Sequence, residues 1–172
     1  MLIDTSTLVR TLQIRHPSWC QNVTVNVNGR HWIESGKPGT YIAVDRKWRD
    51  GDSVEVKLPM SLHFEALPGR SDVIAMLYGP IVLAGRLGRT GLTSGADTII
   101  NERSIGDVLK ENIEVPRLVG NVEEIVKHVK RSSDSALAFR TDGIGDPFDV
   151  ELIPYFRIAH ERYNLYWETK QA

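Results

Sequence analysis

The sequence predicts an all-β protein made of two β-sandwich, jelly-roll-like units, with one or two short helices in the second unit. Three observations predict this class. Apolar and polar residues alternate along short segments, which is the pattern of strands buried on one face. Turn-forming residues separate these segments at intervals of about 8 to 12 residues, a spacing typical of sandwiches. In the second part the alternation gives way to continuous apolar runs, typical of strands covered on both faces.

The change between these two strand types sets the boundary between the units. Val54, Val56 and Leu58 alternate with charged residues, whereas residues 73–78 and 81–84 are continuously apolar. Pro59 lies at the change. We therefore expect a first, incomplete β-sandwich unit over residues 1–60 and a second β-sandwich unit over residues 61–172.

In the first unit, five segments with alternating or β-branched residues predict strands. They cover residues 7–15, 23–27, 30–33, 41–46 and 54–58. Asn28-Gly29 is the strongest hairpin signal, because both residues tolerate the positive φ angles of a type I′ turn. The strand series starts abruptly, so we expect the unit to lack partner strands and to expose the face of Val23, Val25 and Val27.

In the second unit, apolar segments predict strands at both ends of the chain and helices between them. The expected strands cover residues 62–66, 72–78, 81–87, 137–139, 150–153 and 162–167. Tyr163, Leu165 and Trp167 would share one face of the last strand. One helix is expected from a Ser104 cap to about Asn112, and another over residues 122–130, where apolar residues recur at helical spacing.

Composition excludes several classes of partner. The net charge is −1 and the isoelectric point is near 6.5, so no basic face is expected for a nucleic acid. No apolar run approaches the roughly 20 residues that span a bilayer, and no targeting segment is recognised at the N-terminus. We therefore expect neither a nucleic-acid partner nor a membrane partner, and the sequence indicates no compartment.

Several short motifs follow one another along the chain in a fixed order. They are Ile14-Arg15 with Pro17-Ser18-Trp19, Val27-Asn28-Gly29, Gly51-Asp52 with Leu58-Pro59-Met60, Tyr78-Gly79-Pro80, Pro154-Tyr155-Phe156-Arg157-Ile158, and Tyr166-Trp167. This series resembles the C-terminal β-sandwich region of glycoside hydrolase family 127, which is typified by β-L-arabinofuranosidases. The resemblance covers most of the chain, without the catalytic barrel of that family.

The resemblance implies an accessory function rather than catalysis. Family 127 enzymes are understood to use a cysteine nucleophile beside a zinc ion, which one glutamate and several cysteines hold within a helical barrel. Cys20 is the only cysteine of this chain, so such a site cannot be built within it. We expect no catalytic residue, no metal and no cofactor. The expected partner is a catalytic barrel outside this chain or a second copy of the chain.

Paired carboxylates are candidate catalytic groups, because most glycosidases place two of them about 5 to 9.5 Å apart. The candidate pairs are Asp50 with Asp52, Glu123 with Glu124, and Asp146 with Asp149. Acidic residues are common in turns and on protein surfaces, so their presence at these positions does not require a catalytic role. Asp142, Asp146 and Asp149 also lack the residue order of a dedicated calcium loop. A small hydrolase that uses an acid pair is therefore the third hypothesis for the function.

Histidine positions give no metal signal. The five histidines are at least 15 residues apart, so none pairs with another at ligand spacing. They are His16, His31, His63, His128 and His160. Surface or hydrogen-bonded histidines are the simpler interpretation.

Aromatic residues offer another route to a sugar, because a flat ring can stack on the apolar face of a sugar ring. Trp19, Trp32 and Trp48 lie near predicted turns of the first unit and are the candidate carbohydrate-binding residues. Burial at the ends of a small sandwich is the competing interpretation. A free-standing carbohydrate-binding module is therefore the alternative function.

Overall fold

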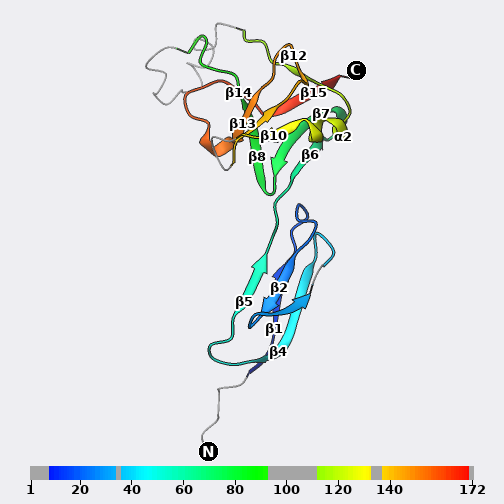
Figure 1. The fold of residues 1–172 in the computed structure, drawn as a ribbon, viewed down its shortest axis with the longest axis vertical. Helices are drawn as coiled ribbons and strands as arrows, with labels where there is room; N and C mark the ends of the chain where they lie inside the picture. Colours follow the sequence, from blue (N-terminus) through cyan, green and yellow to red (C-terminus); the bar gives the residue numbers. More distant parts are fainter. Residues whose placement is uncertain (1–7, 34–35, 93–111, 133–136, 171–172) are drawn as a thin grey trace, which may run out of the picture. The chain divides into compact units, whose positions relative to one another are not determined.

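A computed structural model describes residues 8–33, 36–92, 112–132 and 137–170. The chain divides into two compact units, Met1–Ser61 and Leu62–Ala172, and each unit is described by itself (Figure 1). Strands dominate both units, and the described residues contain one short α-helix and one turn of 3-10 helix. The all-β class is therefore confirmed, whereas the jelly-roll topology stays a prediction.

The first unit consists of two small antiparallel sheets. Its strands are β1 (Leu8–Arg15), β2 (Thr24–Val27), β3 (Arg30–Ile33), β4 (Tyr41–Trp48) and β5 (Val54–Lys57). Strand β1 pairs with β4 over eight residues, and the other sheet has the order β3-β2-β5. Val25 and Val27 of β2 share one buried cluster with Ile42 and Val44 of β4. The two sheets therefore pack on each other through one core.

This arrangement corrects one expectation about the first unit. Val23, Val25 and Val27 are at most 4% exposed, so the face that was expected to be open is closed. The alternating valines predicted strand β2 correctly. Sequence alone did not show that the sheet of β1 and β4 would cover the apolar face of β2.

The Asn28-Gly29 hairpin is confirmed. Asn28 and Gly29 have φ angles of 52° and 73°, which are the left-handed values that a type I′ turn requires. The Asn28 side chain also ties the hairpin to the neighbouring turn, because it accepts a hydrogen bond from the Ser53 backbone N–H at 2.9 Å. Its amide donates to the Asp52 carboxylate at 2.7 Å.

The second unit is organised around one hydrogen-bonded sheet of ten strands. The strands are β6 (Leu62–Leu67), β7 (Arg70–Tyr78), β8 (Ile81–Arg86), β9 (Arg117–Val119), β10 (Val129–Arg131), β11 (Phe139–Thr141), β12 (Gly145–Asp146), β13 (Glu151–Pro154), β14 (Tyr163–Asn164) and β15 (Tyr166–Lys170). The 3-10 turn η1 (Tyr155–Arg157) follows β13 directly. The main path through the sheet is β10-β11-β13-β8-β7-β15-β9-β12.

The hairpin of β7 and β8 opens away from its turn, and the C-terminal segment fills the opening. Near the turn the two strands pair with each other, from Tyr78 with Ile81 to Met76 with Leu83. Farther along, β7 pairs with β15 and β8 pairs with β14. One branch of the sheet continues from β8 and another from β15, and residues of both branches meet in one core that includes Trp167.

The bend between β14 and β15 corrects the prediction for the last strand. Trp167 is fully buried, whereas Tyr163 is 42% exposed and Leu165 lies at a bend between the two strands. The three residues therefore do not share one face. Regular alternation cannot predict a strand that changes its pairing partner in the middle.

The helix α2 (Val122–Lys127) is shorter than the predicted 122–130, because β10 begins at Val129. Asn121 caps it: the side chain accepts a hydrogen bond from the Glu124 backbone N–H, and the Glu124 carboxylate accepts one from the Asn121 backbone N–H. Ile125 anchors the helix in the core. The other expected helix, from Ser104 to about Asn112, falls almost entirely outside the described residues.

The continuous apolar runs of β7 and β8 are covered differently on their two faces. Ile74, Met76 and Leu83 point into the core and are at most 1% exposed. On the opposite face, Ala75 and Leu77 are partly exposed and Val82 is 36% exposed. The expectation of burial on both faces is therefore wrong along this part of the hairpin, and the open face is where the site described below lies.

Candidate functional site

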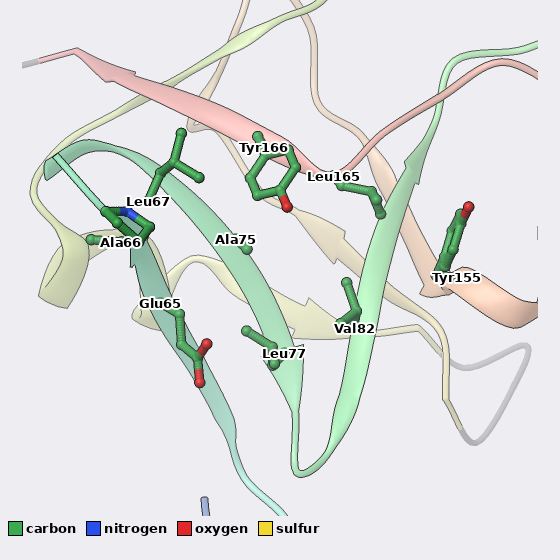
Figure 2. A pocket seen from close by; sticks show the side chains of 10 residues that line it. Glu65, Ala66, Leu67, Ala75, Leu77, Val82, Tyr155, Leu165 and Tyr166 are labelled. Carbon is green, nitrogen blue, oxygen red and sulfur yellow. The ribbon is translucent and has the colours of Figure 1, made fainter. Parts of the chain in front are cut away.

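An open groove with a volume of about 390 Å³ lies on the face of the second unit opposite its core (Figure 2). Ala75, Leu77 and Val82 form its floor. Glu65 of β6 and Tyr166 of β15 stand at its sides, and Tyr155 lies at the end beyond β8. The groove therefore combines an apolar floor with a few polar groups, as ligand sites commonly do.

Strand register explains why the groove forms at this place. Ala75 is directly opposite Glu65 on one neighbouring strand and Tyr166 on the other. Side chains at paired positions of adjacent strands lie on the same face of a sheet. Because alanine is much smaller than its two neighbours, a depression remains between the carboxylate and the phenol ring.

Two tyrosines interact at the end of the groove. The hydroxyl groups of Tyr155 and Tyr163 are 3.2 Å apart, and their ring centroids are 5.3 Å apart. The hydrogen bond with Tyr155, together with desolvation, raises the pKa of Tyr163 above its usual value. The Tyr163 phenol therefore stays neutral at physiological pH and can still donate or accept hydrogen bonds.

The three candidate tryptophans lie in different surroundings within the first unit. Trp19 and Trp48 pack against its core. The Trp48 indole donates to the Arg10 carbonyl oxygen at 2.8 Å, and the Arg46 guanidinium lies 5.1 Å from its ring centroid. Trp32 of β3 is 39% exposed. Of the three, Trp32 is the one whose ring is most available for a ligand, and carbohydrate binding by these residues stays a prediction.

Asp52 has a structural role at its turn. It accepts hydrogen bonds from the Asn28 side chain at 2.7 Å and from the Arg49 backbone N–H at 2.8 Å, and Arg46 lies 3.3 Å away. The bond from Asn28, the backbone bond and the nearby cation lower the pKa of Asp52. This carboxylate is therefore a turn-stabilising group that stays ionised.

Asp149 has a similar role in the broad turn before β13. Its carboxylate accepts hydrogen bonds from the backbone N–H groups of Gly143, Ile144 and Gly145 at 2.7, 3.3 and 3.0 Å. Burial raises the pKa of Asp149, but the backbone bonds and the Thr141 hydroxyl outweigh burial and lower it. Asp146 faces Lys170 at 3.7 Å instead. The two acids are thus tied to different partners.

No metal centre is seen in the part of the chain that the structure describes, because no three His, Cys, Asp or Glu side chains converge there. Cys20 is buried, and its thiol donates to the Asn22 carbonyl oxygen at 3.2 Å. His16 is buried beside it and contacts the Cys20 carbonyl oxygen through Nε2 at 2.7 Å.

Among the described helices, none has the length and apolar character to cross a membrane.

Comparison with known families assigns both units. Residues 3–60 match the family model of the middle domain of GH127 β-L-arabinofuranosidases, and residues 63–169 match DUF4986, a domain of unknown function. Residues 63–169, more than half of the chain, place it in the DUF4986 family, and the match over residues 3–60 relates its first unit to the GH127 middle domain. No curated protein matches the sequence significantly. The resemblance noted from the sequence motifs is thereby confirmed.

Solved structures of glycoside hydrolases, two of them GH127 enzymes, share the fold. A glycoside hydrolase superposes on 94% of this chain with a TM-score of 0.60 and 18% identity. A GH127 β-L-arabinofuranosidase from Geobacillus stearothermophilus T6 covers 96% with a TM-score of 0.59 and 18% identity. A GH127 β-arabinofuranosidase covers 96% with a TM-score of 0.55 and 22% identity. This chain spans 27–30% of the length of these three proteins.

Sequence reasoning missed the groove. Its residues are scattered from Glu65 to Tyr166, whereas the sequence patterns indicated tryptophans and acid pairs as candidates. One signal was present: Ala75 interrupts a run of large apolar residues in β7, so a gap could be expected on one face. The neighbours that line the gap depend on the pairing of β7 with β6 and β15, which sequence alone does not give.

Proposed function

We propose that this chain is a non-catalytic accessory region of a GH127-like glycoside hydrolase, in which two β units support a catalytic barrel outside the chain. The observation that carries the proposal is the match of residues 3–60 to the GH127 middle domain. Solved glycoside hydrolase chains more than three times as long, two of them GH127 enzymes, contain the same fold as one part of their structure. A region of this kind acts by packing rather than by chemistry.

The described side chains are consistent with that role. Asp52, Glu124 and Asp149 bind backbone or side-chain donors of turns and of a helix end. A catalytic carboxylate, by contrast, must present its oxygens to a substrate. The Cys20 thiol is buried and donates to a carbonyl oxygen, which is a poor setting for a nucleophilic thiolate.

Two measurements test the accessory role. We expect no hydrolysis of a chromogenic arabinofuranoside by the isolated chain. We also expect the chain to bind a separately produced helical barrel of a GH127 enzyme, and to raise the melting temperature of that barrel. Turnover that survives Cys20→Ala but is lost in a variant of an exposed carboxylate, such as Glu65→Gln, would contradict the proposal. A barrel that neither binds the chain nor melts at a higher temperature in its presence would contradict the supporting role.

A second candidate function is carbohydrate binding, and the groove of the second unit favours it. Tyr155 and Tyr166 are 45% and 53% exposed over an apolar floor. Such exposed rings beside hydrogen-bonding groups are what a sugar ring requires. This function is compatible with the accessory role, because a supporting region can also hold substrate.

A further inference from the structure

The chemistry of the groove in the second unit selects a class of ligand. Of the ten described residues that line it, Glu65 alone is charged. A phosphate or a carboxylate would meet a negative charge there without a cation to receive it. The rest of the lining consists of apolar side chains and two tyrosines. The groove therefore favours a ligand that is neutral and partly apolar.

Two polar groups at the sides of the groove are available to a ligand. Within the described part of the chain, neither the Glu65 carboxylate nor the Tyr166 hydroxyl has a hydrogen-bond partner. An apolar protein surface laid over the groove would bury both groups without partners, which is costly. A ligand with hydroxyl groups would satisfy both, because it can donate to the carboxylate and can donate to or accept from the phenol.

The spacing of these groups follows from the register. Glu65, Ala75 and Tyr166 are paired positions on three adjacent strands. Adjacent strands are about 4.8 Å apart, so the strands that carry the carboxylate and the phenol lie roughly 10 Å apart. Figure 2 shows Ala75 between the two side chains, with Leu77 and Val82 continuing the floor toward Tyr155. The floor of the groove therefore extends from Ala75 across β7 and β8 toward Tyr155.

We propose that this groove binds a neutral oligosaccharide. One sugar ring places its apolar face against the Tyr166 ring above Ala75, and its hydroxyl groups donate to Glu65. The chain of sugars continues over Leu77 and Val82 toward Tyr155. This site lies in the second unit, whereas the candidate tryptophans belong to the first. The proposal rests on the second candidate function, carbohydrate binding, and does not depend on the accessory role.

The test is titration of the full chain with arabinohexaose, xylohexaose and cellohexaose, followed by calorimetry and by backbone NMR. We expect at least one of the three to bind with millimolar or tighter affinity and to shift the amide signals of Glu65, Ala75 and Tyr166. Binding should change little with salt, since no ion pair forms. Binding that disappears in salt, or shifts confined to the first unit, would overturn the proposal.

Variants separate the contacts. Tyr166→Ala should weaken binding about tenfold through lost stacking, and Tyr166→Phe and Glu65→Gln should each weaken it about threefold to tenfold. Ala75→Leu should abolish binding by filling the groove. Melting curves identify any variant that fails to fold, and the four substitutions give independent readings of the same site.

A matched control uses another exposed aromatic residue of the second unit. Phe156 is 70% exposed and does not line the groove, so Phe156→Ala should leave the affinity unchanged. Trp32→Ala serves the same purpose in the first unit. If none of the three saccharides binds, if Trp32→Ala or Phe156→Ala abolishes binding, or if Ala75→Leu leaves it intact, the groove is not the saccharide site. Groove signals that shift only with protein concentration would assign the surface to a protein contact instead.

Discussion

The indole ring of Trp167 lies directly against the α-carbon of Gly85. A β-carbon built at Gly85 would meet the Cη2 and Cζ2 atoms of that ring at 2.3 Å, closer than real β-carbons approach other atoms. Val150 closes the same space at 2.8 Å. Trp167 is fully buried, so its ring has no free volume into which to retreat. The centre of the second unit therefore requires glycine at this position.

Gly85→Ala should destabilise the second unit by about 1–3 kcal/mol or more, because overpacked cores respond with strained side chains and shifted strands. Urea denaturation followed by far-UV circular dichroism measures the loss. The matched test is the double variant with Trp167→Phe, which removes the atoms that clash. The Trp167 indole N–H has no partner in the described structure, so this second change breaks no hydrogen bond there. Additive effects of the two changes would contradict the steric explanation.

Gly29→Val should destabilise the first unit by about 1–2 kcal/mol, since Gly29 has a φ of 73° that a β-branched residue adopts only with strain. No atom lies within 4 Å of a β-carbon placed there, so the cost is conformational rather than steric. Gly29→Asn is the control, because asparagine tolerates this backbone region. Thermal unfolding of both variants measures the difference, and equal melting temperatures would show that the turn is not under this constraint.

Asp149→Asn should lower the free energy of unfolding at pH 7. The same variant should also make the free energy of unfolding depend less on pH in the acid range. The pKa of Asp149 in the folded state is below the ordinary 3.8, so the unfolded chain takes up a proton first as the pH falls. The stabilisation is complete above the unfolded pKa and is lost as the pH falls through the folded pKa. Urea midpoints between pH 2 and pH 7 measure both effects. A variant whose acid sensitivity equals that of the parent chain would contradict this assignment.

The isolated chain should self-associate through its first unit. In the described structure, β1 and β4 pair only with each other, so each leaves an unpaired outer edge. Open edges with free backbone groups commonly pair with another chain, often in a two-fold dimer. Sedimentation velocity across a concentration series should reveal the dimer. Lys substitution at Ala43, an exposed residue of β4, should weaken it, and a monomer at every concentration would show that the edges are protected.

Local signals in the sequence predicted local structure well. Asn28-Gly29 predicted its turn, and alternating valines predicted β2, because both depend on neighbours in the chain. The predicted end of α2 was wrong. The helical spacing of Val126 and Val129 continues past Lys127, but Val129 already belongs to strand β10. The helical pattern could not show that pairing with β11 would take over at Val129.

The candidate site could not be predicted in the same way. Its residues come together only through the pairing of β7 with β6 and β15, and the last of these strands is distant in sequence. Trp19 and Trp48 were chosen because large rings suit sugars, yet their apolar area is used largely to complete the first core. A pattern of apolar residues predicts that a face of the protein favours burial, but it does not show whether protein or a ligand covers that face.

The insertion of β14 and β15 into the opened hairpin has a consequence for the time order of folding. During synthesis, β7 and β8 leave the ribosome long before Tyr163, so the opening between them stays unfilled while the intervening elements are made. Contacts between such distant segments form slowly because a long loop must close first. The central hairpin of the second unit is thus an unfinished sheet throughout translation, and the last described strand is the one that completes it.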